Sequence, residues 1–210
     1  MATYTMQPAI ADTHIRSDAT TTNYNAQASV GVGESNIAAR VYRGLFKFDM
    51  SGIPSSGETV TSATLSLWTV SDLSGNARTF RVYRVKRNWT HTGATWDTYD
   101  GSNAWGTAGC ANATDRDTTD IGSRSMSATE GALTQCDFPL DTTAIQEMVN
   151  GTVANYGFIV IADTESDDAY LFKSAEGGTP TNAQPLLTVV TTPTAAGNPN
   201  YYYQLINRRR

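Results

Sequence analysis

Apolar and polar side chains alternate along several short stretches of this chain. Between residues 39 and 48 the large apolar side chains recur at Tyr42, Phe46 and Phe48. This period of two predicts a strand with one buried face. The run from Gly157 to Ala162 is almost entirely apolar, which is typical of a central strand covered on both faces. The other expected strands are residues 9–15, 60–67, 80–85, 170–172 and 186–190.

One short helix is expected among these strands. Asp141 is a residue type that caps helix N-termini, and Gly151 is a residue type that ends helices. Between them, Ile145, Met148 and Val149 fall on one face of a helical period. We therefore expect a helix that follows Asp141, ends at Val149 and buries that face.

These elements predict an all-β protein, namely a single antiparallel β-sandwich of the jelly-roll type with one short helix. A chain of 210 residues is long enough for one such domain. We expect an extended N-terminal arm at residues 1–8, the sandwich at residues 9–190, and a linker and extended C-terminal tail at residues 191–210. The expected shared core consists of Phe46, Phe48, Leu65, Leu67, Phe158 and Val160.

The charge content and the lengths of the apolar runs argue against two classes of partner. Charged residues make up 17% of the chain and the formal net charge is −5, whereas a nucleic-acid surface needs clustered Lys and Arg. No run of residues approaches the roughly 20 apolar positions that cross a bilayer. We therefore expect neither a nucleic-acid partner nor a membrane partner.

Catalytic chemistry has little support in the sequence. His14 and His91 are the two side chains whose ordinary pKa suits proton transfer near neutral pH, and neither has an evident partner residue. The motifs of serine hydrolases, zinc proteases and nucleotide-binding proteins are missing. Adjacent acids such as Asp167 and Asp168 are typical of a solvated loop. We expect that the protein is not an enzyme.

Four segments carry a family resemblance. Residues 43–49, RGLFKFD, resemble the strand with Arg, Leu and Phe-Asp of the DNRLRE-type β-sandwich modules, and residues 88–96, NWTHTGATW, resemble the tryptophan loop of that family. Residues 60–67 and 141–151 are similar to its next strand and its short late helix. The group includes alginate-binding carbohydrate-binding modules. The resemblance spans roughly residues 9–190 and implies a β-sandwich that binds and does not catalyse.

An aromatic loop between residues 88 and 105 has two interpretations. It contains Trp89, Trp96, Tyr99 and Trp105. Such a density of aromatic side chains is typical either of an apolar cluster that fastens the loop onto the sandwich (stapling) or of a platform on which sugar rings stack. Trp89 and Trp96 belong to the family pattern, which favours stapling for this pair. The tentative carbohydrate contacts are Tyr99 and Trp105, together with Trp68, which alternation places on an outer face.

Acidic residues in the segment that follows are candidate metal ligands. Asp115, Asp117 and Asp120 supply the oxygen atoms that calcium prefers. Their spacing matches no known calcium loop, so a structural calcium ion is a hypothesis based on composition. No other cofactor is indicated.

The chain has two cysteines, Cys110 and Cys136. A disulfide between them would close the polar excursion at residues 111–135, and proximity of the two residues is our expectation. Two reduced thiols, one in a loop and one at a strand start, are the alternative.

The C-terminal tail is the candidate assembly segment. Its expected contacts are Tyr201, Tyr202, Tyr203, Arg208, Arg209 and Arg210. Without the three arginines the formal charge of the rest is −5 − 3 = −8, so an acidic body and a basic tail favour docking between neighbouring copies.

Together these features predict a non-catalytic structural and binding protein. Residues 1–7 show neither the basic nor the apolar region of a secretory signal. We expect a virion exterior protein of a bacteriophage, such as a capsid decoration protein, assembled in the host cytoplasm. Its partners would be other virion proteins, copies of itself, or a host-surface polysaccharide. The alternative is a carbohydrate-binding module of a polysaccharide-degrading or cell-surface protein, located outside the cell or at its surface.

Overall fold

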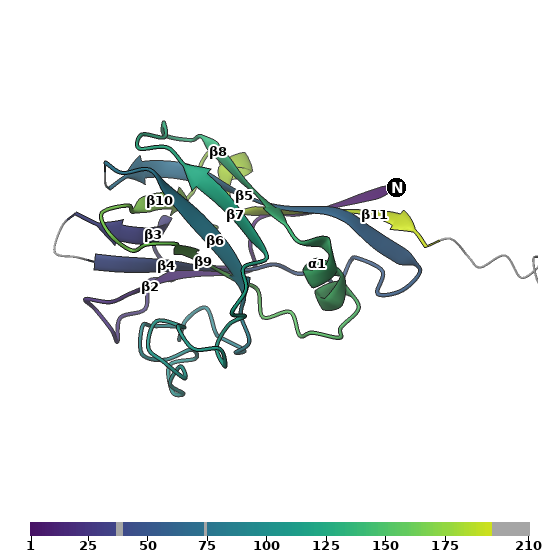
Figure 1. Cartoon of the computed structure of the whole chain (residues 1–210), viewed down its shortest axis with the longest axis horizontal. Helices are drawn as coiled ribbons and strands as arrows, with labels where there is room; N and C mark the ends of the chain where they lie inside the picture. The colour runs from purple at the N-terminus through teal and green to yellow at the C-terminus, as the bar shows by residue number, and fades with distance from the viewer. Residues whose placement is uncertain (37–39, 74, 195–210) are drawn as a thin grey trace, which may run out of the picture.

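The computed structural model describes residues 1–36, 40–73 and 75–194, which form one antiparallel sheet, one α-helix and one 3-10 turn (Figure 1). The elements in chain order are β1 (Ala2–Met6), β2 (Ala11–Arg16), β3 (Ser29–Ser35), β4 (Arg40–Lys47), β5 (Glu58–Asp72), β6 (Arg78–Arg84), β7 (Gly122–Met126), β8 (Gln135–Leu140), α1 (Thr142–Val149), β9 (Phe158–Ala162), β10 (Tyr170–Lys173), η1 (Thr181–Ala183) and β11 (Leu186–Pro193). The expectation of an antiparallel all-β protein with one short helix is confirmed.

The sheet closes on itself through β5. The strand order β5-β10-β3-β4-β9-β6-β7-β8 returns to β5, because β8 also pairs with β5. β5 is 15 residues long. Its residues Ala63–Trp68 pair with β8, while Thr69–Asp72 pair with β10. The two separate sheets expected of a sandwich are therefore joined into one ring. Alternation shows which side chains point inward, but it does not show which strands pair.

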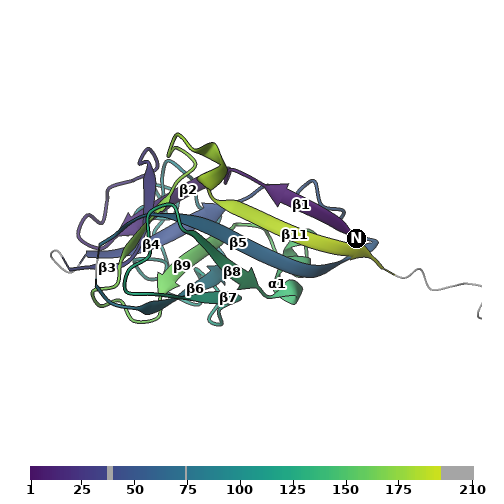
Figure 2. The same ribbon diagram turned by 90° about the horizontal axis from the view of Figure 1, so that it is seen from above.

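Three of the described strands lie outside this ring, of which β2 pairs with β4, and β11 and β1 extend the sheet from β5. β11 pairs with the first part of β5, and β1 pairs with β11 along its whole length, as Figure 2 shows. Residues 1–8, expected as an extended arm, thus contribute a strand to the sheet. Tyr4 and Met6 of this strand pack against the main core. The expected assembly segment at residues 198–210 lies outside the residues that the structure describes.

The interior of the ring is the main hydrophobic core. All six residues expected there are at most 1% exposed, namely Phe46, Phe48, Leu65, Leu67, Phe158 and Val160. The rings of Phe48 and Phe158 are 6.4 Å apart between centroids. The strand patterns therefore identified this core correctly.

The helix α1 lies beside the start of β5 (Figure 1). Its N-terminus is capped as expected, because Asp141 accepts a hydrogen bond from the Ala144 N–H at 2.7 Å. The side chain of Gln146 accepts from the Val60 N–H at 2.7 Å, which ties the helix to β5. Among the described residues, no helix is long and apolar enough to cross a membrane.

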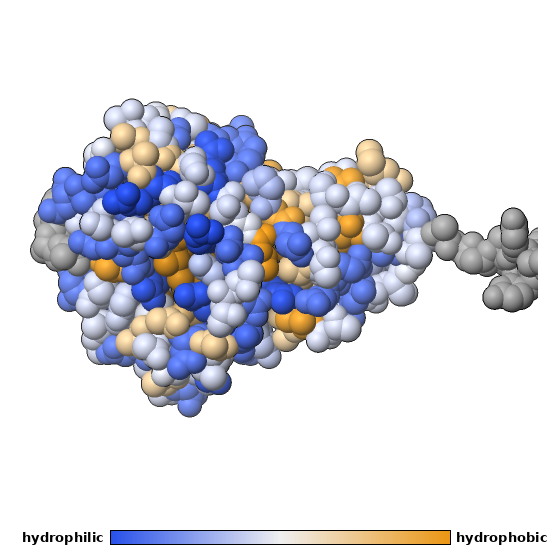
Figure 3. Space-filling view, viewed as in Figure 1, coloured by the Kyte–Doolittle hydropathy of each residue, from blue (hydrophilic) through white to orange (hydrophobic). Residues whose placement is uncertain are grey.

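The face of the molecule drawn in Figure 3 is mostly hydrophilic over the strand ring. Apolar residues appear there as small, separate patches, both over the ring and near the β1–β11–β5 extension. On this face, a functional site is therefore better sought in grooves and individual aromatic side chains than in a broad apolar surface.

Candidate functional site

The aromatic loop covers the outer side of the ring and forms a second apolar cluster. Trp89 and Trp105 are 1% and 4% exposed, and they pack with Leu45 of β4 and Ile159 of β9. The indole N–H of Trp89 donates to the Tyr156 carbonyl at 2.7 Å. Trp89 therefore holds the loop against the sheet, as expected. Trp105 does the same, although the sequence suggested it as a sugar contact.

Arg43 of β4 fixes the loop to the sheet. Its guanidinium lies 4.9 Å from the ring centroid of Trp96. Its Nε and Nη2 donate to the two carboxylate oxygens of Glu165 at 2.7 and 2.8 Å, and Nη1 donates to the Gly109 carbonyl at 2.7 Å. Every nitrogen of this arginine is committed to the protein, so Arg43 has a structural role.

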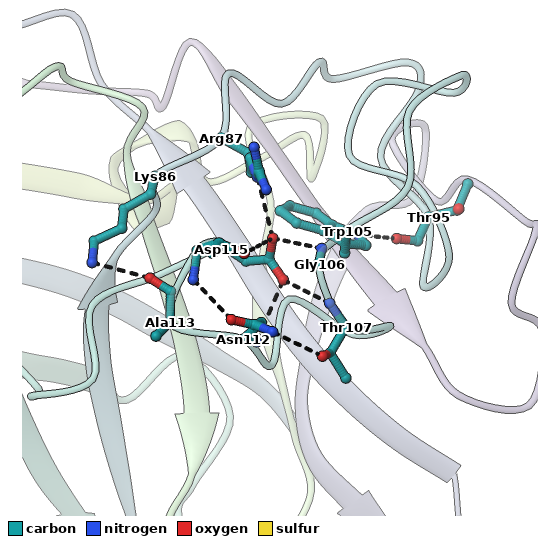
Figure 4. A network of polar contacts seen from close by, with 10 residues as sticks. Lys86, Arg87, Thr95, Trp105, Gly106, Thr107, Asn112, Ala113 and Asp115 are labelled. Atoms are coloured by element: carbon teal, nitrogen blue, oxygen red, sulfur yellow. Dashed lines mark hydrogen bonds and ion pairs between the residues drawn. The ribbon is translucent and has the colours of Figure 1, made fainter.

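Asp115 organises the loop from within (Figure 4). It is fully buried, accepts hydrogen bonds from the Gly106 and Thr107 N–H groups at 2.7 and 3.1 Å, and pairs with Arg87 at 3.3 Å. Beside it, the Trp105 indole donates to the Thr95 carbonyl at 2.9 Å. These contacts satisfy the carboxylate without a metal ion.

The other two candidate calcium ligands are paired with different cations. Asp117 lies 2.6 Å from Arg84 and 3.2 Å from Lys86, and Asp120 lies 3.4 Å from Arg81. Within the described ranges, no group of three or more His, Cys, Asp or Glu side chains could hold a metal ion. The three aspartates therefore do not converge on one centre.

The expected disulfide is not formed, since both cysteines are free thiols. Cys136 of β8 points into the main core, while Cys110 packs in the second cluster on the outer side of the sheet. Burial raises the pKa of the Cys136 thiol to about 11 and also raises that of Cys110. The expectation was wrong because residues near the ends of a loop can face opposite sides of a sheet.

Of the three candidate sugar contacts, Trp68 and Tyr99 are partly exposed and lie apart. Tyr99 rests against Trp105, with 5.7 Å between ring centroids, and Arg87 lies 5.7 Å from its ring. Trp68 stands on β5, in register with Gln135 of β8. The structure thus does not gather these side chains into one platform.

A groove that the sequence did not indicate lies on the face formed by β2, β3, β4 and β10. Its volume is about 290 Å³. It is lined by His14, Arg16, Tyr24, Gln27, Ser29, Ser35, Arg40, Tyr42, Leu73 and Leu171. The groove combines aromatic rings, cations and small hydroxyl or amide groups, which are the side chains that line polar-ligand sites.

Glycine and strand alternation build the floor of the groove. His14 and Arg16 of β2 are two residues apart and project from the same face. Tyr42 of β4 packs over Gly31 of β3, where a Cβ atom would lie only 2.5 Å from the Tyr42 ring. A side chain at position 31 would therefore displace Tyr42 from the floor.

Tyr24 forms one wall and comes from the segment between β2 and β3. Its ring stacks on His14, with 4.5 Å between centroids and an interplanar angle of 18°, and the Arg16 guanidinium lies 4.8 Å from its centroid. The Asn23 amide anchors the segment by donating to the His91 and Ala94 carbonyls at 3.0 and 2.8 Å. Tyr24 is partly exposed, and its contacts with His14 and Arg16 hold its ring in one orientation.

The groove carries a surplus of positive charge. The Nε atoms of Arg16 and Arg40 lie 2.5 and 2.9 Å from the two carboxylate oxygens of Asp18. Two guanidinium groups and one carboxylate give this cluster a net charge of +1. These contacts are close but lack hydrogen-bond geometry, since both Nε atoms have no hydrogen-bond partner. Part of the donor capacity of the two guanidinium groups is therefore uncommitted.

His14 is neutral at pH 7. Burial and the nearby Arg16 lower its pKa to about 4, and its Nδ1 accepts a hydrogen bond from the Gly31 N–H at 3.2 Å. It serves as a fixed, uncharged ring beneath Tyr24. The signal that could have identified this site was the placement of His14 and Arg16 on one strand face, followed by a lone tyrosine in a Thr- and Asn-rich segment.

Comparison with known proteins bears on this region. The model of carbohydrate-binding module family 96 matches residues 3–124, more than half of the chain. The match includes every groove-lining residue except Leu171. No curated protein matches the chain.

Proposed function

Because the chain belongs to carbohydrate-binding module family 96, we propose that it is a non-catalytic module that binds a polysaccharide in the groove beside Tyr24. The observation that carries the proposal is the ring of Tyr24, partly exposed and fixed by stacking on His14, next to two arginines. Aromatic rings present a flat apolar face to the C–H groups of a sugar, while planar polar side chains fix its hydroxyl groups.

The charge of the groove favours an acidic polysaccharide. Arg16 and Arg40 share one carboxylate, Asp18, and together they retain a net positive charge. A guanidinium binds a carboxylate through two parallel hydrogen bonds, so a uronic acid residue fits this pair. The groove is thus a local cationic site on a protein with a formal net charge of −5.

Affinity gel electrophoresis and calorimetry with alginate and polygalacturonate test the proposal. We expect retardation of the wild-type protein, and about tenfold weaker binding after Tyr24→Ala or Arg40→Gln, because each change removes a direct contact. Tyr83→Ala and Arg81→Gln are matched controls. Tyr83 also carries an arginine over its ring, and Arg81 is as exposed as Arg40, but both lie outside the groove.

Equal binding by the Tyr24→Ala variant and the wild type would reject the groove as the site. The virion exterior role stays a prediction from the sequence, as does the location of the protein. That prediction drew on the lack of a secretory signal at residues 1–7 and on the tail at residues 198–210, which is not among the described residues, and the family match supports the carbohydrate-binding alternative instead.

A further inference from the structure

Trp68 stands on an outer face of the sheet, away from both hydrophobic clusters. Leu65 and Leu67 of β5 point into the core, so the alternation of the strand turns Ser66 and Trp68 to the other side. The indole is partly exposed. It pairs in register with Gln135 of the neighbouring strand β8.

The other three tryptophans of the chain have structural partners, and Trp68 differs from them. Trp89 and Trp105 donate their indole N–H groups to carbonyl oxygens, and Trp96 lies under Arg43. In the part of the chain that the structure describes, Trp68 has no ring contact, no cation over its face and no acceptor for its N–H. The aromatic face and the indole N–H of Trp68 therefore have no partner among the described residues.

Two exposed polar side chains of β8 flank this indole. Asp137 accepts hydrogen bonds through Oδ1 from Ser66 Oγ at 2.6 Å and from Gln135 Nε2 at 2.9 Å. These bonds fix the orientation of both planar groups. The second carboxylate oxygen of Asp137 and the amide oxygen of Gln135 accept no hydrogen bond within the described residues.

This cluster offers the contacts that a sugar ring requires. A pyranose ring can stack its C–H face on the indole of Trp68, while its hydroxyl groups donate to the free oxygens of Gln135 and Asp137. The charge selects the class of sugar. Asp137 is an acceptor that repels a uronate, and the neighbouring outer-face positions Thr64, Thr188 and Pro139 are uncharged.

We propose that Trp68, Gln135 and Asp137 form a second carbohydrate-binding site, specific for neutral polysaccharides. It is separate from the cationic groove. Trp68 on β5 belongs to the new site, whereas Leu73, just beyond the end of that strand, lines the groove. The two sites have opposite charge preferences, so the protein can bind an acidic chain and a neutral chain at the same time.

The experiment compares two variants on two classes of probe. Wild-type protein, Trp68→Ala and Tyr24→Ala are titrated with the neutral polysaccharides xyloglucan and galactomannan and with the acidic polysaccharide alginate. We expect Trp68→Ala to weaken binding of a neutral probe about tenfold and to leave alginate binding unchanged. Tyr24→Ala should show the reverse pattern.

The Gln135→Ala variant separates loss of binding from loss of folding. Gln135 is exposed, so this variant should keep the wild-type thermal unfolding curve and still lose affinity for the neutral probe by about two- to tenfold. A wild-type protein that binds alginate but neither neutral probe would overturn the second site and leave the groove standing. Loss of neutral binding in Tyr24→Ala but not in Trp68→Ala or Gln135→Ala would also overturn it. Neutral binding without alginate binding would instead support the second site and reject the groove.

Discussion

The guanidinium of Arg43 lies 4.9 Å from the ring centroid of Trp96, joining strand β4 to the aromatic loop that follows β6. The two residues are 53 positions apart in the chain (96 − 43 = 53). Arg43 also binds both oxygens of Glu165 and the carbonyl of Gly109. One side chain therefore holds three separate segments on the outer side of the sheet.

Replacing Arg43 with Ala should lower the free energy of unfolding by about 1.5–3 kcal/mol, because it removes charge-assisted hydrogen bonds at a largely buried site. The side chains of Arg43 and Glu165 are only 13% and 19% exposed. Urea denaturation measures the change. Arg81→Ala, at a solvent-exposed ion pair, should cost less than about 1 kcal/mol. Similar losses in both variants would contradict the anchoring role of Arg43.

Truncation of the core at Phe48 should be more costly. Phe48 is 1% exposed and packs against Phe158 inside the ring. We expect Phe48→Ala to lower the free energy of unfolding by about 3–5 kcal/mol, because it leaves a cavity that the strands cannot fill. The same measurement on Val70→Ala, at a side chain that is 39% exposed, should give a much smaller change. A loss below that of the control would refute the assignment of the core.

Gly93 permits a close approach inside the aromatic loop. A Cβ atom at this position would lie 2.2 Å from the Asp100 carbonyl oxygen, which belongs to the backbone and cannot rotate away. We expect Gly93→Ala to lower the midpoint of thermal unfolding, with a cost of about 1–3 kcal/mol. Gly52→Ala is the control, because a Cβ atom there meets nothing within 4 Å. An unchanged midpoint in Gly93→Ala would show that the loop can adapt.

The two thiols should be inert in the folded protein. Cys110 and Cys136 are both 0% exposed, and burial raises the pKa of each. Since the thiolate is the reactive form, Ellman's reagent should react with neither until denaturant is added. A reductant should leave the unfolding midpoint unchanged. A fall in the midpoint under reducing conditions would point to a disulfide and against this structure.

Two buried groups should make opposite contributions to the pH dependence of stability. Burial raises the pKa of Asp12 from 3.8 to about 7, with the neighbouring Glu176 adding to the shift, and burial lowers the pKa of His14 from 6.5 to about 4. The folded state therefore binds more protons at Asp12 and fewer at His14 than the unfolded state does. As the pH rises from about 4 to 7, the Asp12 contribution to stability is lost and the His14 contribution is gained.

Asp12→Asn separates these contributions. The amide retains an acceptor for the Ala175 N–H, to which Asp12 is bonded at 2.8 Å, but it does not titrate. The stability of this variant, relative to wild type, should improve as the pH rises from 4 to 7. Denaturation curves at several pH values test this sign, and a relative stability that falls with rising pH would contradict it.

The sequence by itself determined the local features of this protein. Alternation placed Phe46, Phe48, Leu65 and Leu67 in the core, because a strand turns every second side chain to the same face. Asp141 marked the start of α1, because a carboxylate there satisfies a free backbone N–H at the first turn. The motifs around Arg43 and Trp96 indicated a domain similar to carbohydrate-binding modules. Each of these features depends on residues close together in the chain.

The tertiary structure alone decided which distant residues meet. Closure of the ring depends on β5 pairing with both β8 and β10, and the groove depends on His14, Tyr24 and Tyr42 converging from two strands and a connecting segment. Burial of Trp105 and exposure of Trp68 depend on which surfaces the aromatic loop covers. Cys110 and Cys136 remain unpaired because the sheet separates them. Contacts between segments far apart in the chain depend on tertiary packing, and local sequence patterns show which face of a strand is apolar but not which segment covers it.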